Sequence, residues 1–211
     1  MKLSHYAKVS ATCLVLAGCS APALRTTPAM TVATEAEVAR LQQWTVWQAR
    51  GRLAVKTAND GFNAHFNWRQ AVGETELVVE GPFGAGHSRV LASAERIRLE
   101  AGGQPALEFH APFEGAESAL AERVGFGLPL GALAFWLRGV PDPVAVTQAA
   151  PVANAGTVSA GVGSFAQAGW RIQPEGPVIV ERAPAALPSR VTLTRGDVRI
   201  RVVIDQWSAE P

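Results

Sequence analysis

The sequence predicts a mainly β protein with a single folded domain, whose antiparallel strands form a sandwich or a barrel. Two observations lead to this fold class. Apolar and polar residues alternate with period two over many segments, as expected for strands with one buried and one solvated face. One stretch in the middle, residues 129–139, instead repeats leucine at helical spacing and is apolar most of the way round. Such a helix must cover an apolar surface.

The alternating segments predict an antiparallel meander. Residues 47–56 form the first strand, and residues 62–69 form the second after Asn59-Asp60-Gly61, a typical hairpin turn. Two further extended runs flank the glycine-rich segment 81–86. Because so many half-buried strands occur in one domain, a sandwich or barrel is favoured. The remaining predicted strands cover residues 96–100, 107–110, 169–172, 190–193 and 198–205.

Three short helices are predicted. Residues 35–44 form a lead-in helix before the first strand, and residues 115–124 form a second helix with an i, i+4 apolar pair. In the third helix, Pro129 precedes leucines at spacing i, i+3, i+7, and Gly139 provides a C-terminal stop. Residues 149–164 are rich in alanine, glycine and valine without periodicity, which indicates a long loop.

The pattern leaves two interpretations of the interior open. If the sheet curls, its dry face and the apolar helix enclose a pocket. Otherwise the same residues fill an ordinary packed core. From the pattern alone the packed core is the favoured interpretation.

The N-terminus predicts export. Lys2 and Lys8 precede an apolar run, residues 9–17, which is too short to span a bilayer. The spelling Leu16-Ala17-Gly18-Cys19 resembles the lipobox of bacterial lipoproteins, and this resemblance implies cleavage before Cys19 and acylation of that residue. An ordinary signal peptide with a chance cysteine is the alternative.

The predicted organisation has three parts. Residues 1–18 are the lipoprotein signal, residues 19–36 are a lipidated flexible tether, and residues 37–211 are one domain. The tether is small, polar and proline-containing, and as a coil it would have an end-to-end distance of roughly 20–24 Å. Ser20, rather than aspartate, follows the lipidated position, which in such lipoproteins is compatible with the outer membrane.

Composition excludes several classes of protein. Without the signal the chain has 17 Lys+Arg and 18 Asp+Glu, so it lacks the basic excess of a nucleic-acid-binding protein. Cys13 leaves with the signal, so Cys19 has no intramolecular disulfide partner. No later apolar run reaches the roughly 18 residues of a transmembrane helix. Four arginines are expected on a solvated face, with contact to anionic lipid or an acidic partner as the alternative: Arg50, Arg52, Arg199 and Arg201.

Catalytic and metal-binding signals are weak. His65, His87 and His110 lie far apart without metal-ligand spacing, and are expected to be solvated. There is no Gly-x-Ser-x-Gly motif and no Gly-x-x-x-x-Gly-Lys phosphate-binding loop. Residues 161–166 spell a dinucleotide fingerprint, but they lack the strand–turn–helix context that the motif requires. We therefore expect no catalytic residues, no metal and no cofactor, and hence no enzyme.

Seven motifs, taken in order, resemble the LolB family of outer-membrane lipoprotein receptors. They follow the lipobox and read WQARGRLAV, GFNAHFNWRQ, GPFG, LPLGALAFWLRG, GWRI, LPSRVTLTR and VRIRVVIDQW. The resemblance covers almost the whole mature chain and implies an open antiparallel β-barrel with a short helical lid over an apolar cavity. It also implies a receptor that accepts acylated lipoproteins from a soluble periplasmic carrier and inserts them into the inner leaflet of the outer membrane.

The resemblance assigns roles to individual residues. In the family a large aliphatic residue protrudes from the loop where this chain has Phe83, between Pro82 and Gly84, and is tied to lipid insertion. We therefore expect Phe83 to be a membrane-touching tip, with a ring packed against a strand or the lid as the alternative. The acyl cavity is expected to be lined by dry-face residues of the strands and the lid: Trp47, Phe66, Trp68, Leu77, Leu99, Leu133, Trp136 and Leu137.

The expected partners are a soluble LolA-like carrier, acylated lipoprotein cargo and outer-membrane lipid. The protein is expected to be a monomer, anchored through Cys19 on the periplasmic face of the outer membrane. A generic periplasmic lipid-binding lipoprotein and a structural assembly lipoprotein with a filled core are the alternatives. A transmembrane barrel is disfavoured by the lipobox and by the interrupting helix.

Overall fold

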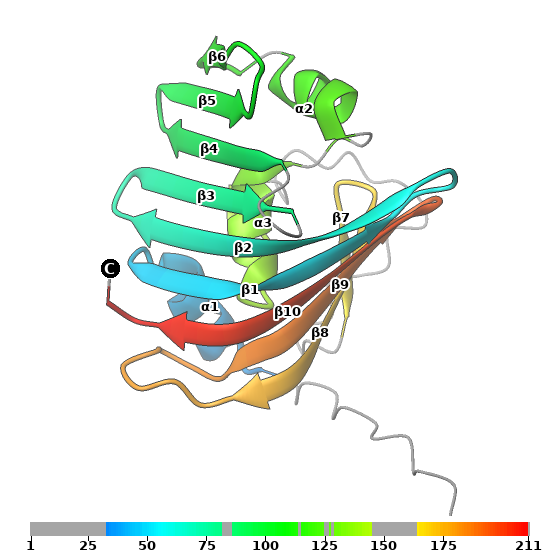
Figure 1. Ribbon diagram of the computed structural model, residues 1–211. Coiled ribbons are helices and arrows are strands. Elements are labelled where there is room, and N and C mark those ends of the chain that lie inside the picture. The colour runs from blue at the N-terminus through cyan, green and yellow to red at the C-terminus, as the bar shows by residue number, and fades with distance from the viewer. Residues whose placement is uncertain are drawn as a thin grey trace, which may run out of the picture.

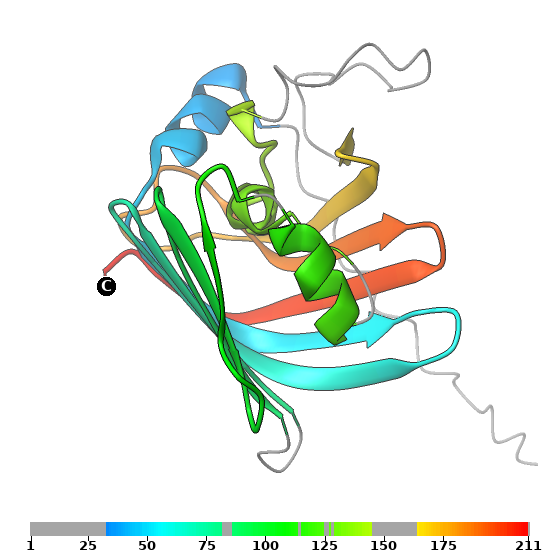
Figure 2. The ribbon, with the colours of Figure 1, turned by 90° about the horizontal axis from the view of Figure 1, so that it is seen from above.

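One curved antiparallel sheet forms the protein in a computed structural model that describes residues 33–81, 86–113, 115–124, 127, 129–144 and 164–210. Its ten strands follow the order β6-β5-β4-β3-β2-β1-β10-β9-β8-β7. Within this part of the chain β6 and β7 are the two edges and do not pair, so the sheet is open. Its curvature creates a concave and a convex face (Figures 1 and 2). The predicted class, a mainly β open barrel or curved sheet, is confirmed.

The elements have the following bounds. The helices are α1 (Glu35–Gln43), α2 (Ala116–Val124) and α3 (Leu130–Leu137). The strands are β1 (Trp47–Lys56), β2 (Gly61–Ala71), β3 (Glu74–Glu80), β4 (His87–Ser93), β5 (Arg96–Ala101), β6 (Leu107–His110), β7 (Phe165–Gln167), β8 (Trp170–Val178), β9 (Leu187–Arg195) and β10 (Val198–Ser208).

The chain closes its meander by placing its last strand beside its first. β1 pairs with β2 from Trp47↔Gln70 to Lys56↔Gly61, which is the predicted hairpin. On its other side β1 pairs with β10, from Gln48↔Ser208 to Lys56↔Arg199. The two ends of the described domain therefore meet in the middle of the sheet, and β1 and β10 become central strands.

β8 is longer than its alternating pattern predicts. It includes Pro174 and Pro177, which would normally argue against a strand because proline cannot donate to the ladder. The β7–β8 pairing ends at Phe165↔Ile172, so these prolines lie where β8 pairs only with β9. An edge-like position of this kind tolerates proline.

All three helices lie on the concave side of the sheet (Figure 2). α1 begins with a capping box, in which Thr34 accepts from the Glu37 backbone N–H and the Glu37 carboxylate accepts from the Thr34 N–H. The hydrogen bonds that the Thr34 backbone N–H and then the Thr34 hydroxyl donate to the Glu37 carboxylate lower the pKa of Glu37. α3 follows Pro129 and ends before Gly139, whose positive φ of 78° permits the turn out of the helix. No helix in the described part of the chain is long and apolar enough to cross a membrane.

Tryptophans dominate one end of the core. The rings of Trp47 and Trp68 stack with centroids 5.7 Å apart, and Trp207 lies 5.5 Å from Trp47 on its other side. Trp207 donates its indole N–H to the carbonyl of Pro188 at 2.9 Å. The tryptophans therefore fill only this end of the concave face.

Candidate functional site

α3 lies across the concave face and presents two different apolar surfaces. Its leucines at positions 130, 133 and 137 share one side, as their spacing predicts, and this side borders a cavity. Trp136 points elsewhere, because its indole N–H donates to Gln167 at 2.7 Å and its ring meets Trp170 at 6.4 Å. One surface of α3 therefore holds the helix against β7 and β8, and the other forms the roof of the cavity.

The cavity between α3 and the sheet has a volume of about 370 Å³. Strands β1 to β4, β9 and β10 form its floor, and none of the side chains that line it carries a charge among the residues described. Among the described residues that line it, Asn63 and Ser88 are the two with polar amide or hydroxyl side chains, and Asn63 lies at an outward position of β2. An apolar cavity with so few hydrogen-bonding groups favours a ligand that offers methylene groups rather than a specific polar pattern.

Five of the eight predicted lining residues border this cavity: Phe66, Trp68, Leu77, Leu133 and Leu137. They come from β2, β3 and α3, three elements that the fold brings to one place. The three strand residues follow the period-two alternation of β2 and β3, and the two leucines follow the helical spacing of α3.

Three predicted residues do not line the cavity: Trp47, Leu99 and Trp136. All three are buried, and Trp47 and Trp136 belong to the packed hydrophobic core. The ring of Trp47 is enclosed between Trp68 and Trp207, and Trp136 is bonded to β7. Alternation shows which face a side chain occupies, but it does not show which part of that face is filled by neighbours.

Sequence reasoning also missed cavity residues. Most of them occupy inward positions on the predicted strands, so the alternation could have identified them; Gly81 and Gly86 instead flank the β3–β4 connection. The missed residues are Leu53, Val55, Phe62, Val79, Gly81, Gly86, Val90, Leu193, Ile200 and Val202. Leu130, at the start of α3, was predicted as part of the helix but not as a cavity residue.

A second cavity of about 330 Å³ lies on the other side of α3. It shares Leu130, Trp68, Leu77 and Val90 with the first cavity, so α3 separates two chambers of one concave surface. Its wall is more polar and includes Gln70, Thr75 and Arg138 among others.

Arg138 connects two of the helices. Its guanidinium donates to the carbonyl oxygens of Leu41 and Trp44 at the end of α1 and to Ala134 within α3. It also lies over the Phe135 ring, 4.7 Å from the ring centroid. Burial lowers the pKa of Arg138 to about 10, so it stays protonated at neutral pH and interacts favourably with the carbonyl end of α1. This contact holds α3 over the sheet.

Two predicted sites lie outside the described residues. One is the membrane-touching tip, Phe83 with its neighbours Pro82 and Gly84. The other is the lipidation site, Cys19. The two glycines that flank the tip are described, and both Gly81 and Gly86 line the first cavity. The described ends of the β3–β4 connection therefore both lie at the cavity.

Other candidate sites receive no support. His65, His87 and His110 are exposed on separate strands, and the described residues contain no group of three or more His, Cys, Asp or Glu side chains able to hold a metal. Phe165 begins a strand, whereas a dinucleotide fingerprint at 161–166 would require a helix there.

An open antiparallel sheet curved around a charge-free apolar cavity, with an apolar helix as its roof, defines a protein of the lipid-binding class. The model of the family "Outer membrane lipoprotein LolB" matches residues 45–207, so the chain belongs to the LolB family of outer-membrane lipoproteins. The match begins just before β1 and ends one residue before the end of β10, and thus contains α2, α3 and nearly all of the sheet.

Curated relatives agree with the family model. The chain is 34% identical over 177 residues to the outer-membrane lipoprotein LolB of Alkalilimnicola ehrlichii, which covers 82% of each protein. It is 31% identical over 172 residues to the LolB of Halorhodospira halophila, covering 82% of this chain and 78% of the relative. With the LolB of Pseudomonas aeruginosa it shares 27% identity over 168 residues, covering 80% and 77%.

Proposed function

We propose that this protein is an outer-membrane receptor that accepts acylated lipoproteins from a soluble periplasmic carrier and inserts them into the inner leaflet of the outer membrane. The observation that carries the proposal is the apolar cavity under α3, whose lining side chains bear no charge among the described residues. Family membership supports the same function. No step of it requires a catalytic group or a nucleotide.

The cavity suits the physical problem of moving acyl chains through water. Each methylene group left in water costs about 0.8 kcal/mol, so a long acyl chain needs an apolar shelter during transfer. Phe66, Trp68 and the leucines of α3 provide that shelter without selecting for a particular polypeptide. A receptor for many different lipoproteins needs this lack of polar selectivity.

Release into the membrane would use the segment that carries Phe83. Gly81 and Gly86 line the cavity, so a group between them is connected to the place where the acyl chains would lie. A phenylalanine ring inserted into the acyl boundary of a leaflet gains roughly 1.5–3 kcal/mol. This energy is enough for contact and too small for anchoring, which we assign to acylated Cys19.

Transfer can be measured with the full acylated protein reconstituted in liposomes. An acylated lipoprotein is supplied as a complex with its carrier, and the fraction of cargo that moves to the liposomes is recorded. We expect transfer without ATP, and a strong reduction when liposomes lack the protein. Depletion in the native host should leave lipoproteins in the periplasm or the inner membrane.

The same experiments distinguish the alternatives. A generic lipid-binding lipoprotein would bind acyl probes but would not change where lipoproteins accumulate after depletion. If lipoproteins still reach the outer membrane in normal amounts, the proposed function is wrong.

A further inference from the structure

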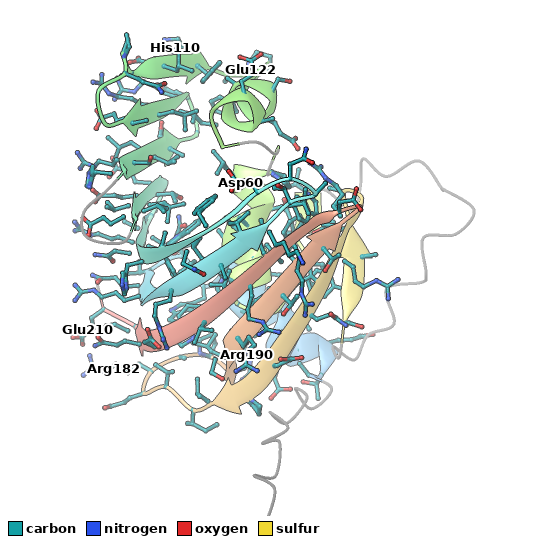
Figure 3. All side chains as sticks on the ribbon, turned by 45° about the vertical axis from the view of Figure 1, so that its right-hand side comes forward. Asp60, His110, Glu122, Arg182, Arg190 and Glu210 are labelled. Atoms are coloured by element: carbon teal, nitrogen blue, oxygen red, sulfur yellow. The ribbon has the colours of Figure 1, made fainter. Side chains whose placement is uncertain are left out.

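The convex face of the sheet is uncovered by the described helices, which all lie on the opposite side (Figure 2). Its side chains therefore meet solvent or a partner. Arg190, which is labelled in Figure 3, lies on this face in β9. The proposed function makes no use of this face.

Charge is distributed unevenly over the convex face. On β1, β8, β9 and β10, the outward positions hold seven Lys and Arg side chains but only two carboxylates, Glu175 and Asp205. Both carboxylates are already paired, Asp205 with Arg52 at 2.9 Å and Glu175 with Arg190 at 3.4 Å. Five cations have no carboxylate within ion-pair distance in the described part of the chain, and we call these five the convex basic face: Arg50, Lys56, Arg171, Arg199 and Arg201.

The strand order concentrates these cations. Lys56 is the direct cross-strand partner of Arg199, and Thr194 of β9 lies between Arg199 and Arg171 of β8. Like charges on adjacent positions repel and destabilise the sheet, so this arrangement carries an energetic cost. A chain with nearly equal numbers of acidic and basic residues thus gathers unpaired positive charge on one surface.

The other half of the convex face provides a contrast. On β3 to β6 each outward arginine has a glutamate partner, with Arg89 bonded to Glu76 at 2.7 Å and Arg98 bonded to Glu100 at 2.7 Å. Arg96 lies 3.6 Å from Glu108. Charge pairing thus neutralises the arginines of β3 to β6, whereas the five cations of the convex basic face have no carboxylate partner among the described residues.

A shallow hollow of about 320 Å³ lies beside Arg201, a member of the convex basic face. It forms at Ala54, the only small side chain in the outward row of β1 between Arg52 and Lys56. Ala54 pairs with Arg201 of β10 on one side and with Asn63 of β2 on the other. Arg201 and Asn63 line the hollow beside Arg52, whose guanidinium is bonded to Asp205, so an anionic oxygen placed there could accept hydrogen bonds from Arg201 and Asn63.

We propose that the convex basic face is a docking surface for the phosphate headgroups of an anionic phospholipid membrane. The outward positions of β1, β8, β9 and β10 carry no aromatic residue, and aromatic anchors are what a specific protein interface normally offers. Basic side chains on a broad surface are what an anionic membrane attracts. An outer-membrane lipoprotein is held close to such a surface, so that even weak attraction is effective.

The test uses the full acylated protein reconstituted in vesicles. A fluorophore is attached to Gln173→Cys, an exposed outward position of β8, and its quenching by nitroxide-labelled headgroups is measured. We expect at least about threefold stronger quenching in vesicles with anionic phosphatidylglycerol than in vesicles of neutral phosphatidylcholine, because charge attracts the face to the surface. The difference should vanish in 1 M NaCl, where the screening length falls to about 3 Å. The same label at His110→Cys, on β6, should show little dependence on lipid charge.

Two triple variants separate local charge from net charge. The first variant combines Lys56→Glu, Arg199→Glu and Arg201→Glu. It should remove the additional quenching in anionic vesicles, because it reverses the sign of three charges on the convex basic face. The matched control changes Arg40, Arg96 and Arg182 to glutamate, which alters net charge equally at other exposed sites and should retain the effect. Thermal melting of both variants verifies folding. Equal quenching of wild type in neutral and anionic vesicles, or equal loss in both variants, would overturn the proposal and leave an acidic protein as the candidate partner.

Discussion

Leu77 and Val78 are neighbours in β3 whose side chains lie on opposite faces of the sheet. Leu77 lines both chambers beside α3, whereas Val78 pairs with Asn67 and Arg89 and faces outward. Leu77→Trp should fill the space under α3 and weaken binding of a fluorescent fatty-acyl probe by about tenfold, a change that needs only ~1.4 kcal/mol. Val78→Trp is the matched control and should leave probe affinity unchanged. Equal affinity in both variants would show that acyl chains do not occupy this cavity.

Phe83 is the second residue for which a single substitution is decisive. If its ring touches the membrane, Phe83→Glu should melt normally and accept cargo, yet fail to deliver it to liposomes, because a carboxylate is not inserted into the acyl region. Phe83→Leu should preserve delivery, since leucine keeps the apolar contact. A large fall in melting temperature of the glutamate variant would instead show that the ring is packed within the protein.

At the scale of elements, an irregularity between β1 and β10 shapes the sheet. The pairing shifts between Arg50 and Gly51, so Asp205 of β10 is an additional residue without a partner in the ladder. A bulge of this kind bends the strand and increases its twist, which helps the sheet curve around the cavity. Gly51 fits there because a Cβ atom would lie 2.0 Å from the carbonyl oxygen of Val203 and 2.9 Å from the Phe66 ring.

Gly51→Ala should therefore destabilise the protein by about 3 kcal/mol, measured by chemical denaturation, since backbone must shift to admit the methyl group. Gly131→Ala in α3 is the contrasting variant. Beyond the backbone of α3 itself, no atom of the described residues lies within 4 Å of a Cβ built there, so alanine should add about 0.5–1 kcal/mol through its higher helix propensity. If the two substitutions have the same effect on stability, close packing at the bulge is not what excludes a side chain from position 51.

At the scale of the whole molecule, membrane attachment and membrane docking should be separable. Cys19→Ala should prevent acylation, so the protein should no longer run heavier than its polypeptide or partition into detergent. The convex basic face alone should not compensate, because attraction of about 1 kcal/mol per cation near an anionic surface is screened by salt. Fractionation in 0.5 M salt, followed by mass spectrometry of the N-terminus, measures both properties. An acylated, membrane-bound Cys19→Ala protein would contradict the lipoprotein interpretation of the N-terminus.

Much of the local structure could be predicted from the sequence by itself. Period-two alternation identified β1, β2 and β10, and the leucine spacing of α3 identified the side of the helix that forms the cavity roof. Family motifs then directed the choice between a packed core and a pocket. These features depend on residues close together in the chain, whose periodicity reflects which side of an element is dry.

Only the tertiary structure determined which neighbours each inward-facing or outward-facing side chain contacts. Trp47 and Phe66 both face inward, yet Trp47 is sealed between two other indoles while Phe66 borders the cavity. Arg171 and Lys56 lie 115 positions apart, and they belong to one charged surface because β8, β9, β10 and β1 are consecutive in the sheet. Alternation is a local property of a strand. The neighbours of a side chain depend on which distant strands pair, and in this protein the last strand returns to pair with the first.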